Sequence, residues 1–175
     1  MISMKKYDYD RILPTNYKLA FKDADIRGYY GTEIDEVLVY RVAQAFVLEF
    51  SLTKVLVGRD MRISSPSLRD AFVAGATDAG ALVIDVGLVT TPMLYFVSAT
   101  MSLYGVMITA SHNPADYNGL KLVMPGAIPL TNKTGLKNIE HHVTKNILVK
   151  NKKIGQVKKQ RIYQEYNRFV VVRLI

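Results

Sequence analysis

The sequence predicts an α/β protein, a three-layer α/β/α sandwich built on a mixed, mostly parallel sheet. Short apolar runs rich in valine and isoleucine alternate with longer segments whose apolar residues recur at helical spacing. Such alternation is typical of a largely parallel sheet that is covered by helices on both faces. With 175 residues, of which 49% are hydrophobic, the chain can bury the core of one domain of ordinary size.

The strands are expected at short apolar runs, and three of them cover residues 54–57, 81–86 and 104–108. A fourth strand is expected over residues 120–124. It follows the third after a loop of about ten residues, which is short for a helical crossover. We therefore expect this last strand to return antiparallel to its neighbour.

The helices are expected between these strands, where the apolar residues recur at helical spacing. Pro66 and Pro92 stand near the first turns of two of them, where the missing amide proton does no harm. Gly80 follows the end of one helix. The expected helices begin at residues 32–35 and cover residues 66–79, 92–100 and 131–146.

A loop after the 104–108 strand carries a dense group of reactive side chains. Ser111, His112, Asn113 and Lys121 fall within eleven residues. Ligands of open α/β sheets bind outside the carboxyl ends of the strands, so the position of this loop favours a functional site. Its Asn-Pro and Asn-Gly dipeptides are also ordinary turn formers. The alternative interpretation, an exposed turn with no chemical function, therefore stays open at this point.

Phosphoryl transfer is a reaction that these residues would serve. A serine hydroxyl is a weak nucleophile, and a phosphorylated resting state that passes its group onward is chemically sensible for Ser111. His112 and Lys121 can exchange protons or stabilise charge. Asn118 and Gly119 are expected to form a tight turn that brings the backbone amides and Lys121 back toward the serine.

Two arginines are candidates for gripping phosphate oxygens, because a guanidinium offers paired donors. Arg59 follows the carboxyl end of a predicted strand, and Arg27 precedes a glycine. Each arginine also has a simpler explanation as one half of a local ion pair. The pairs to consider are Arg27 with Asp23 or Asp25, and Arg59 with Asp60.

The string Thr-Ala-Ser-His-Asn-Pro-x-x-Tyr-Asn-Gly-x-Lys around Ser111 resembles the phosphoserine loop of the α-D-phosphohexomutases. The resemblance is greatest to the phosphomannomutase/phosphoglucomutase branch, and it covers about residues 20–150. Three further segments stand in the order and approximate spacing of that family. They are Asp-Ile-Arg-Gly from residue 25, Val-Gly-Arg-Asp from residue 57 with Arg62 and Ser64, and Asp-Val-Gly from residue 85 before Thr-Pro.

The resemblance implies that Ser111 is a phosphoserine that donates to O1 or O6 of a sugar phosphate through a bisphosphorylated intermediate. Its phosphate would also be a ligand of Mg²⁺, and glucose or mannose 1,6-bisphosphate would be the activator. His112 and Lys121 correspond to residues credited with proton transfer and phosphate stabilisation, and Arg27 to an arginine that faces the active site. Tyr-Asn at residues 117–118, where phosphoglucosamine mutases have Asp-Asn, favours mannose and glucose phosphates as substrates.

Enzymes of this family have four domains, and the resemblance implies that the chain holds the first. We expect an N-terminal extension over residues 1–20, the phosphoserine domain over 21–150, and a basic tail over 151–175 that enters the second domain. The Asp-Gly-Asp-Gly-Asp-Arg metal loop is absent from the sequence, and so are the sugar-recognition loop and the phosphate clamp. The remaining mutase domains are therefore the expected partners, and the chain alone should have little or no turnover.

Two local features depart from the expected pattern. Lys22 and Ala24 replace an arginine and an aromatic residue that are usual before Asp-Ile-Arg-Gly. The apolar run at residues 169–175 indicates a strand or a shortened helix whose apolar surface is uncovered, as in a chain that stops early.

The net charge of +8 lies in the last third of the chain. Residues 1–120 hold 11 Lys or Arg against 13 Asp or Glu, whereas residues 121–175 hold 12 against 2. A second hypothesis is therefore a non-catalytic module, either a pseudoenzyme that docks on a partner or a binder of polyanions. The simpler explanation is a solvated hairpin and helix, and without a helix-turn-helix pattern nucleic acid is not expected. The basic residues concerned are Lys150, Lys152, Lys153, Lys158, Lys159 and Arg161.

The composition excludes several classes of protein. The chain has no cysteine, which excludes disulfides and thiolate metal sites and suits a reducing cytosol. No run of eighteen apolar residues and no signal-peptide pattern occurs, so we expect a cytoplasmic protein that does not enter a membrane. His141 and His142 have no third ligand at metal spacing and are interpreted as surface residues.

Overall fold

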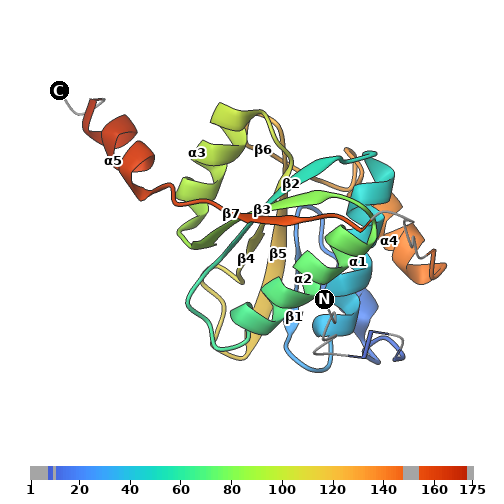
Figure 1. Cartoon of the computed structure of the whole chain (residues 1–175). Coiled ribbons are helices and arrows are strands. Elements are labelled where there is room, and N and C mark those ends of the chain that lie inside the picture. Colours follow the sequence, from blue (N-terminus) through green and yellow to red (C-terminus); the bar gives the residue numbers. More distant parts are fainter. Residues whose placement is uncertain (1–7, 10, 148–153, 173–175) are drawn as a thin grey trace.

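A computed structural model describes residues 8–9, 11–147 and 154–172. Strands and helices alternate along most of this length (Figure 1), as the sequence predicts. The elements are a 3-10 helix at Tyr17–Ala20, β1 (Ile26–Tyr29), α1 (Glu36–Glu49), β2 (Lys54–Arg59), α2 (Ser65–Asp78), β3 (Leu82–Leu88), α3 (Thr91–Met101), β4 (Gly105–Ile108), β5 (Tyr117–Met124), β6 (Ile128–Pro129), α4 (Leu136–Thr144), β7 (Val157–Lys159) and α5 (Tyr163–Val172).

The strands form one mixed sheet in the order β1-β5-β4-β2-β3-β7, with β6 paired to β5. β2 runs parallel to both β3 and β4, and β7 runs parallel to β3. β5 is antiparallel to β4 and to β1. The antiparallel return of the strand after the serine loop is therefore confirmed, and so is the mixed, mostly parallel sheet.

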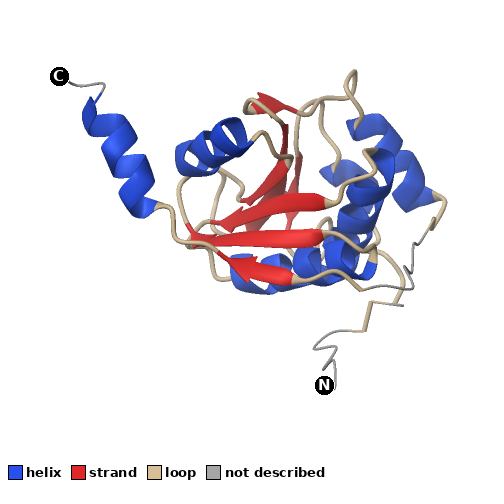
Figure 2. Ribbon diagram, turned by 45° about the horizontal axis from the view of Figure 1, so that its top comes forward, coloured by secondary structure: helices blue, strands red, loops and turns tan. Residues whose placement is uncertain are grey.

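Helices cover both faces of this sheet (Figure 2), which confirms the three-layer arrangement. α1, α2 and α4 contribute to the larger core, where Phe46, Phe72 and Ile139 are fully buried. α3 covers the opposite face, where Leu94 and Met107 belong to a smaller core. Each buried phenylalanine contributes about 2 kcal/mol of hydrophobic free energy, so the α1–α2 side holds much of the stability.

The first two helices are fixed by their starts and by close mutual packing. The Asp35 carboxylate accepts a hydrogen bond from the Leu38 amide at 2.8 Å and caps α1. Burial raises the pKa of the Asp35 carboxyl above its ordinary value. A Cβ at Gly75 of α2 would stand only 2.2 Å from the Tyr40 carbonyl oxygen of α1. Glycine thus lets the two helices pack closely.

The expected turn at Asn118 and Gly119 is wrong. Both residues lie inside β5, where they pair with Gly28 and Arg27 of β1. A Cβ at Gly119 would stand 2.4 Å from the Ile26 carbonyl oxygen. The glycine is therefore required by the close approach of two strands, and β1 itself is a strand that the sequence analysis did not identify.

The C-terminal segment differs from the expected hairpin. β7 adds a short parallel strand beside β3, and its three side chains are exposed. The run from residue 169 continues α5, whose Phe169 lies 4.6 Å from Phe96 of α3 between ring centroids. No residue of α5 is buried, and Figure 1 shows the helix extending away from the sheet. Residues 173–175 lie outside the described residues.

The predicted domain limits stay predictions. The limit after residue 150, with Lys150, Lys152 and Lys153, falls in residues 148–153, outside the described part of the chain. The helix expected over residues 131–146 is shorter, because Thr134 accepts a hydrogen bond from the Thr131 amide at 2.8 Å and forms a turn before α4. Among the described residues, no helix is long and apolar enough to span a membrane.

We predict that Gly119→Ala destabilises the domain by about 3 kcal/mol, because the added methyl group forces β1 and β5 apart. Gly31→Ala is the control: its Cβ meets nothing within 4 Å, and its φ of +90° makes the alanine cost only about 1 kcal/mol. Urea unfolding of both variants measures the difference. Equal losses would show that backbone conformation, and not strand contact, decides the effect.

Candidate active site

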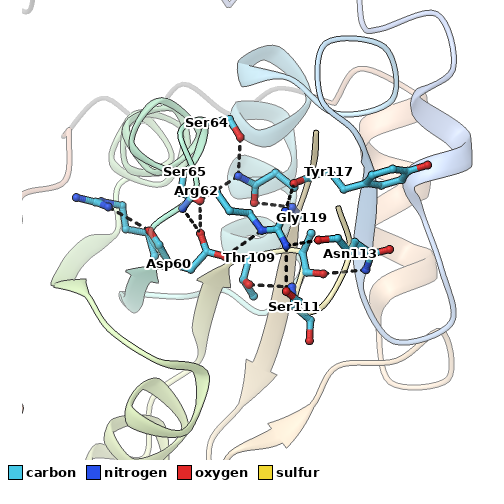
Figure 3. A network of polar contacts seen from close by, with 12 residues as sticks. Asp60, Arg62, Ser64, Ser65, Thr109, Ser111, Asn113, Tyr117 and Gly119 are labelled. Carbon is cyan, nitrogen blue, oxygen red and sulfur yellow. Dashed lines mark hydrogen bonds and ion pairs between the residues drawn. The ribbon is translucent and has the colours of Figure 1, made fainter. Parts of the chain in front are cut away.

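Ser111 follows the carboxyl end of β4 in a strained conformation. Its φ of +56° lies in the left-handed region, which costs a residue other than glycine about 1 kcal/mol or more. The Ser111 amide donates to Thr109 Oγ1 at 2.9 Å. The side chain is exposed, and Figure 3 shows it directed away from the polar network behind the loop. The surroundings hold the backbone and leave the hydroxyl accessible.

Arg62 holds the backbone of this loop. Its guanidinium reaches across from the segment between β2 and α2 and donates to four carbonyl oxygens (Figure 3). The acceptors are Pro114 at 2.6 Å and Tyr117 at 2.9 Å on Nη1, and Ser111 at 2.9 Å and Asn113 at 2.7 Å on Nη2. One side chain therefore fixes the backbone from the serine to Tyr117.

Asp60 orients Arg62. Its Oδ2 lies 3.3 Å from Arg62 Nε, and its Oδ1 accepts the Arg62 amide at 3.1 Å. Ser65 at the start of α2 donates its hydroxyl to the same Oδ1 at 2.5 Å. The Asp60 amide in turn donates to the Ile108 carbonyl of β4 at 3.0 Å. The ends of β2 and β4 and the start of α2 thus form one support for the loop.

Asn118 connects β5 to this support. Its side chain is fully buried, and its Nδ2 donates to the hydroxyls of Ser64 at 2.8 Å and Ser65 at 3.0 Å. Its Oδ1 accepts the Gly119 amide at 2.8 Å. Every polar group of the amide is therefore used within the fold, and Asn118 shapes the site without facing a ligand.

Asn113 and His112 differ in their surroundings. Asn113 donates its amide and its Nδ2 to the Ala110 carbonyl, at 3.1 and 2.8 Å, and so closes the turn. His112 is exposed and makes no hydrogen bond or ion pair with the described residues. Its imidazole is therefore available to a ligand beside Ser111.

Arg27 and Lys121 meet at a single carboxylate. Asp25, which is 9% exposed, places Oδ2 at 3.8 Å from Arg27 Nε and 3.4 Å from Lys121 Nζ. Burial, and then the Asp25 charge, raise the pKa of Tyr95 on α3 above its ordinary value, so the cluster faces α3. The local pair of Arg27 with Asp25 is confirmed. One carboxylate balances one of the two cations, and a net positive charge stays.

The expected ion pair of Arg59 with Asp60 is wrong. Arg59 Nη1 donates to the backbone oxygen of Asp60 at 3.1 Å, whereas the Asp60 carboxylate binds Arg62. Arg59 lines a pocket with Arg69 and Asp85, apart from the groups that hold Ser111. The structure therefore does not bring Arg59 together with the serine loop, and a phosphate role for it there stays a prediction.

The described residues do not form a metal centre by themselves. No group of three or more His, Cys, Asp or Glu side chains stands close enough to hold an ion in the described ranges. His142 does have a carboxylate partner, which the sequence did not indicate: its Nε2 lies 2.9 Å from Glu49 Oε2. Hydrogen bonds from Asn138 and His142 lower the pKa of Glu49, and the contact fastens α4 to α1.

The sequence analysis named Arg62 within a motif but gave it no role. Its acceptors stand 49 to 55 residues further along the chain, so no local spacing connects them. The roles of Asp60 and Thr109 were also missed, although each holds a residue only two positions further along the chain. The sequence contains one weak signal for this support, the charged pair Arg59-Asp60 directly after an apolar strand.

The fold and the site together define an α/β/α domain that presents an exposed serine, on a loop held by hydrogen bonds, at the carboxyl edge of its sheet. Residues 18–150 match the family described as phosphoglucomutase/phosphomannomutase, alpha/beta/alpha domain I. The chain therefore belongs to this family, as its domain I, and the resemblance noted in the sequence is confirmed.

Relatives agree with this assignment. The chain is 39% identical over 152 residues to a phosphomannomutase of Vibrio cholerae, covering 83% of this chain and 33% of the relative. A phosphomannomutase of Klebsiella pneumoniae is 41% identical over 127 residues, covering 72% of this chain and 81% of the relative. A crystal structure of a phosphoglucomutase/phosphomannomutase family protein from Burkholderia thailandensis has a TM-score of 0.79 at 28% identity, covering 91% of this chain and 36% of the other. The chain thus spans about a third of the Vibrio cholerae relative.

We predict that Arg62→Lys loosens the serine loop, because an ammonium keeps the charge but cannot serve four carbonyls in a fixed fork. Amide exchange in residues 109–117 should accelerate at least about tenfold, and stability should fall by about 2 kcal/mol. Arg69→Lys is the control, since Arg69 bonds carboxylates that lysine can still reach. Hydrogen exchange with mass spectrometry measures the exchange rates of both variants. Unchanged exchange in the Arg62 variant would refute the role of Arg62 in holding the loop.

Proposed function

We propose that the chain is the phosphoserine domain of a phosphohexomutase that interconverts the 1- and 6-phosphates of mannose or glucose. The observation that carries the proposal is that Ser111 combines a hydrogen-bonded backbone with an exposed hydroxyl. Its amide donates to Thr109 Oγ1 and its carbonyl accepts from Arg62, while its hydroxyl is exposed beside His112, which has no partner among the described residues. Membership of a family with phosphomannomutase relatives supports the choice of substrate.

The proposed transfer uses the residues of the loop as follows. Ser111 Oγ attacks a phosphorus atom of a bisphosphorylated sugar, the Oγ–P bond forms, and the bond from phosphorus to the sugar oxygen breaks. The Oγ proton leaves to a base, for which we propose His112, and the departing sugar oxygen receives a proton. By the reverse of this step, phosphorylated Ser111 gives its group to the free hydroxyl of an incoming sugar monophosphate, and a bisphosphorylated sugar forms. Once this sugar has turned round, Ser111 removes the phosphoryl group from its other oxygen, so the phosphate of the sugar has changed between O1 and O6.

Arg27 and Lys121 are proposed to stabilise the transferred group. Phosphoryl transfer depends on positioning and on cations directed at the phosphate oxygens. Asp25 holds both cations on adjacent strands and cancels one of their two charges. The surplus charge would attract a phosphate, and the shared carboxylate would keep both side chains extended toward it.

Mg²⁺ enters the proposal only through Ser111. The described residues form no carboxylate cage that would hold the ion by itself. When bound, it would neutralise phosphate charge. Phosphorylated Ser111 would be the contribution of this chain, and the carboxylates that Mg²⁺ prefers would come from another domain. Glucose or mannose 1,6-bisphosphate is the proposed phosphate donor.

The remaining mutase domains are proposed as the partners of this chain. It corresponds to a third of the length of the Vibrio cholerae relative. Turnover needs the metal, the nucleophile and a closed sugar site together, and the described residues supply the nucleophile and two cations. We therefore propose that the 175-residue chain has no mutase activity by itself.

We predict that Ser111 becomes phosphorylated when the chain is incubated with glucose 1,6-bisphosphate and the remaining domains of the Vibrio cholerae relative. Peptide mapping by mass spectrometry should locate the phosphate on Ser111, and Ser111→Ala should remove it. Ser102→Ala is the matched control, because Ser102 is also exposed with a left-handed φ of +52° and should not affect labelling. Phosphate on another residue would contradict the assignment. Glucose 6-phosphate formation from glucose 1-phosphate by the chain alone would refute its inactivity.

We predict that Lys121→Ala slows phosphorylation of Ser111 at least about 100-fold, because a cation directed at the transferred group is lost. The melting temperature should change little, since Asp25 keeps Arg27 as its partner. Lys54→Ala, on the exposed beginning of β2, is the control and should affect neither quantity. A loss of thermal stability that matches the loss of rate would make Lys121 a structural residue instead.

A further inference from the structure

A second pocket opens at the carboxyl edge of the sheet, with a volume of about 480 Å³. It lies between the ends of β2, β3 and β7 and the helix α2, and none of its lining residues belongs to the serine loop. This volume is in the range of small-molecule pockets, about 300–1,000 Å³. We call it the basic pocket, lined by Arg59, Arg69, Asp85, Val86, Gly87, Lys159, Gln160 and Arg161.

The strand register directs charged side chains into the basic pocket. Lys159 of β7 stands opposite Asp85 of β3, which stands opposite Val57 of β2. Because directly paired strand residues face the same side of a sheet, all three point toward the α2 face. Beyond Asp85 the register shifts, and Gly87 adopts a φ of +77°. A bulge of this kind redirects the following side chains and opens the end of the sheet.

The charges of the basic pocket are not balanced. Four cations surround one carboxylate, and Asp85 is already engaged with Arg69 at 3.5 Å and with the Gly87 amide at 2.9 Å. Arg59, Lys159 and Arg161 form no ion pair within the described residues. Arg69 Nε is moreover buried without a hydrogen-bond partner among those residues. Three uncompensated cations at one hollow repel one another, and a bound anion would relieve the repulsion.

The lining residues favour a small anion over a nucleic acid. Single-stranded nucleic acids bind on aromatic platforms, and the basic pocket has no aromatic side chain in its lining. Guanidinium groups match the paired oxygens of a phosphate. Three uncompensated positive charges, at the ends of β2 and β7, exceed the charge of one phosphate group.

We propose that the basic pocket binds a small molecule that carries a diphosphate or two phosphate groups. The anion lies between Arg59 on one side and Lys159 with Arg161 on the other, while Asp85 keeps Arg69 in place beneath it. This site is separate from the phosphate position at Ser111, and the proposal does not depend on the mutase reaction.

The test measures binding of pyrophosphate to the 175-residue chain by isothermal titration calorimetry. Wild type should bind one pyrophosphate, and inorganic phosphate at least about tenfold more weakly. Lys159→Glu and Arg161→Glu should each weaken pyrophosphate binding at least about tenfold without changing the melting temperature of the free chain, because both side chains are exposed. Lys158→Glu is the matched control: it lies on the same strand opposite Ile84, faces the other side of the sheet, and should change the affinity less than about twofold.

Several results would overturn the proposal. No binding of pyrophosphate, or equal affinity for inorganic phosphate, would exclude a site for two phosphate groups. An equal loss in Lys158→Glu would show that diffuse charge attracts the anion. Loss of binding in an Arg27→Ala, Lys121→Ala double variant, with full binding in Lys159→Glu, would assign the pyrophosphate to the serine loop. Failure of Ser111 phosphorylation would leave the calorimetric result unaffected, so the two proposals are tested apart.

Discussion

The serine loop depends on the hydrogen bonds of Arg62 to four backbone carbonyls. A loop that leaves the end of a strand loses the ladder partners of its carbonyl groups, and unpaired carbonyls without water are costly. Arginine can replace those partners because its guanidinium carries five donors in a rigid plane. Asp60 fixes the direction of that plane. Arg62 therefore stabilises the left-handed conformation of Ser111 through its carbonyl group, on the side of the loop opposite the exposed hydroxyl.

The atoms that hold the loop in place are therefore different from the atoms that are free to contact a ligand. Arg62 contacts main-chain oxygens, so the side chains of Ser111 and His112 stay exposed. The cations come from another part of the sheet, where the antiparallel pair of β1 and β5 places Arg27 and Lys121 beside Asp25. A loop rigid in its backbone and open in its side chains can accept a phosphate without first being ordered by it.

The alternating strands and helices were predictable because apolar periodicity is local. The antiparallel direction of β5 was predictable from the length of the loop before it. Other features depend on partners that are distant in sequence. β1 is a strand only because β5 lies beside it, and the same pairing overrides the turn preference of Asn118 and Gly119. Arg62 acquired its role from carbonyls 49 to 55 residues away, which no spacing rule connects. Sequence patterns therefore located the serine loop and missed its support.

Charge is organised by the sheet edge and not by the sequence count. Both faces of the carboxyl edge present cations in excess, and these cations come from both the acidic and the basic parts of the chain. On the α3 face, buried Asp25 anchors Arg27 and Lys121. On the α2 face, buried Asp85 anchors Arg69 among further cations that β2 and β7 supply. A buried carboxylate in each place offsets part of the repulsion and fixes one or two cations in position. Because the parallel strands end together, the remaining positive charge gathers where an anion can reach it.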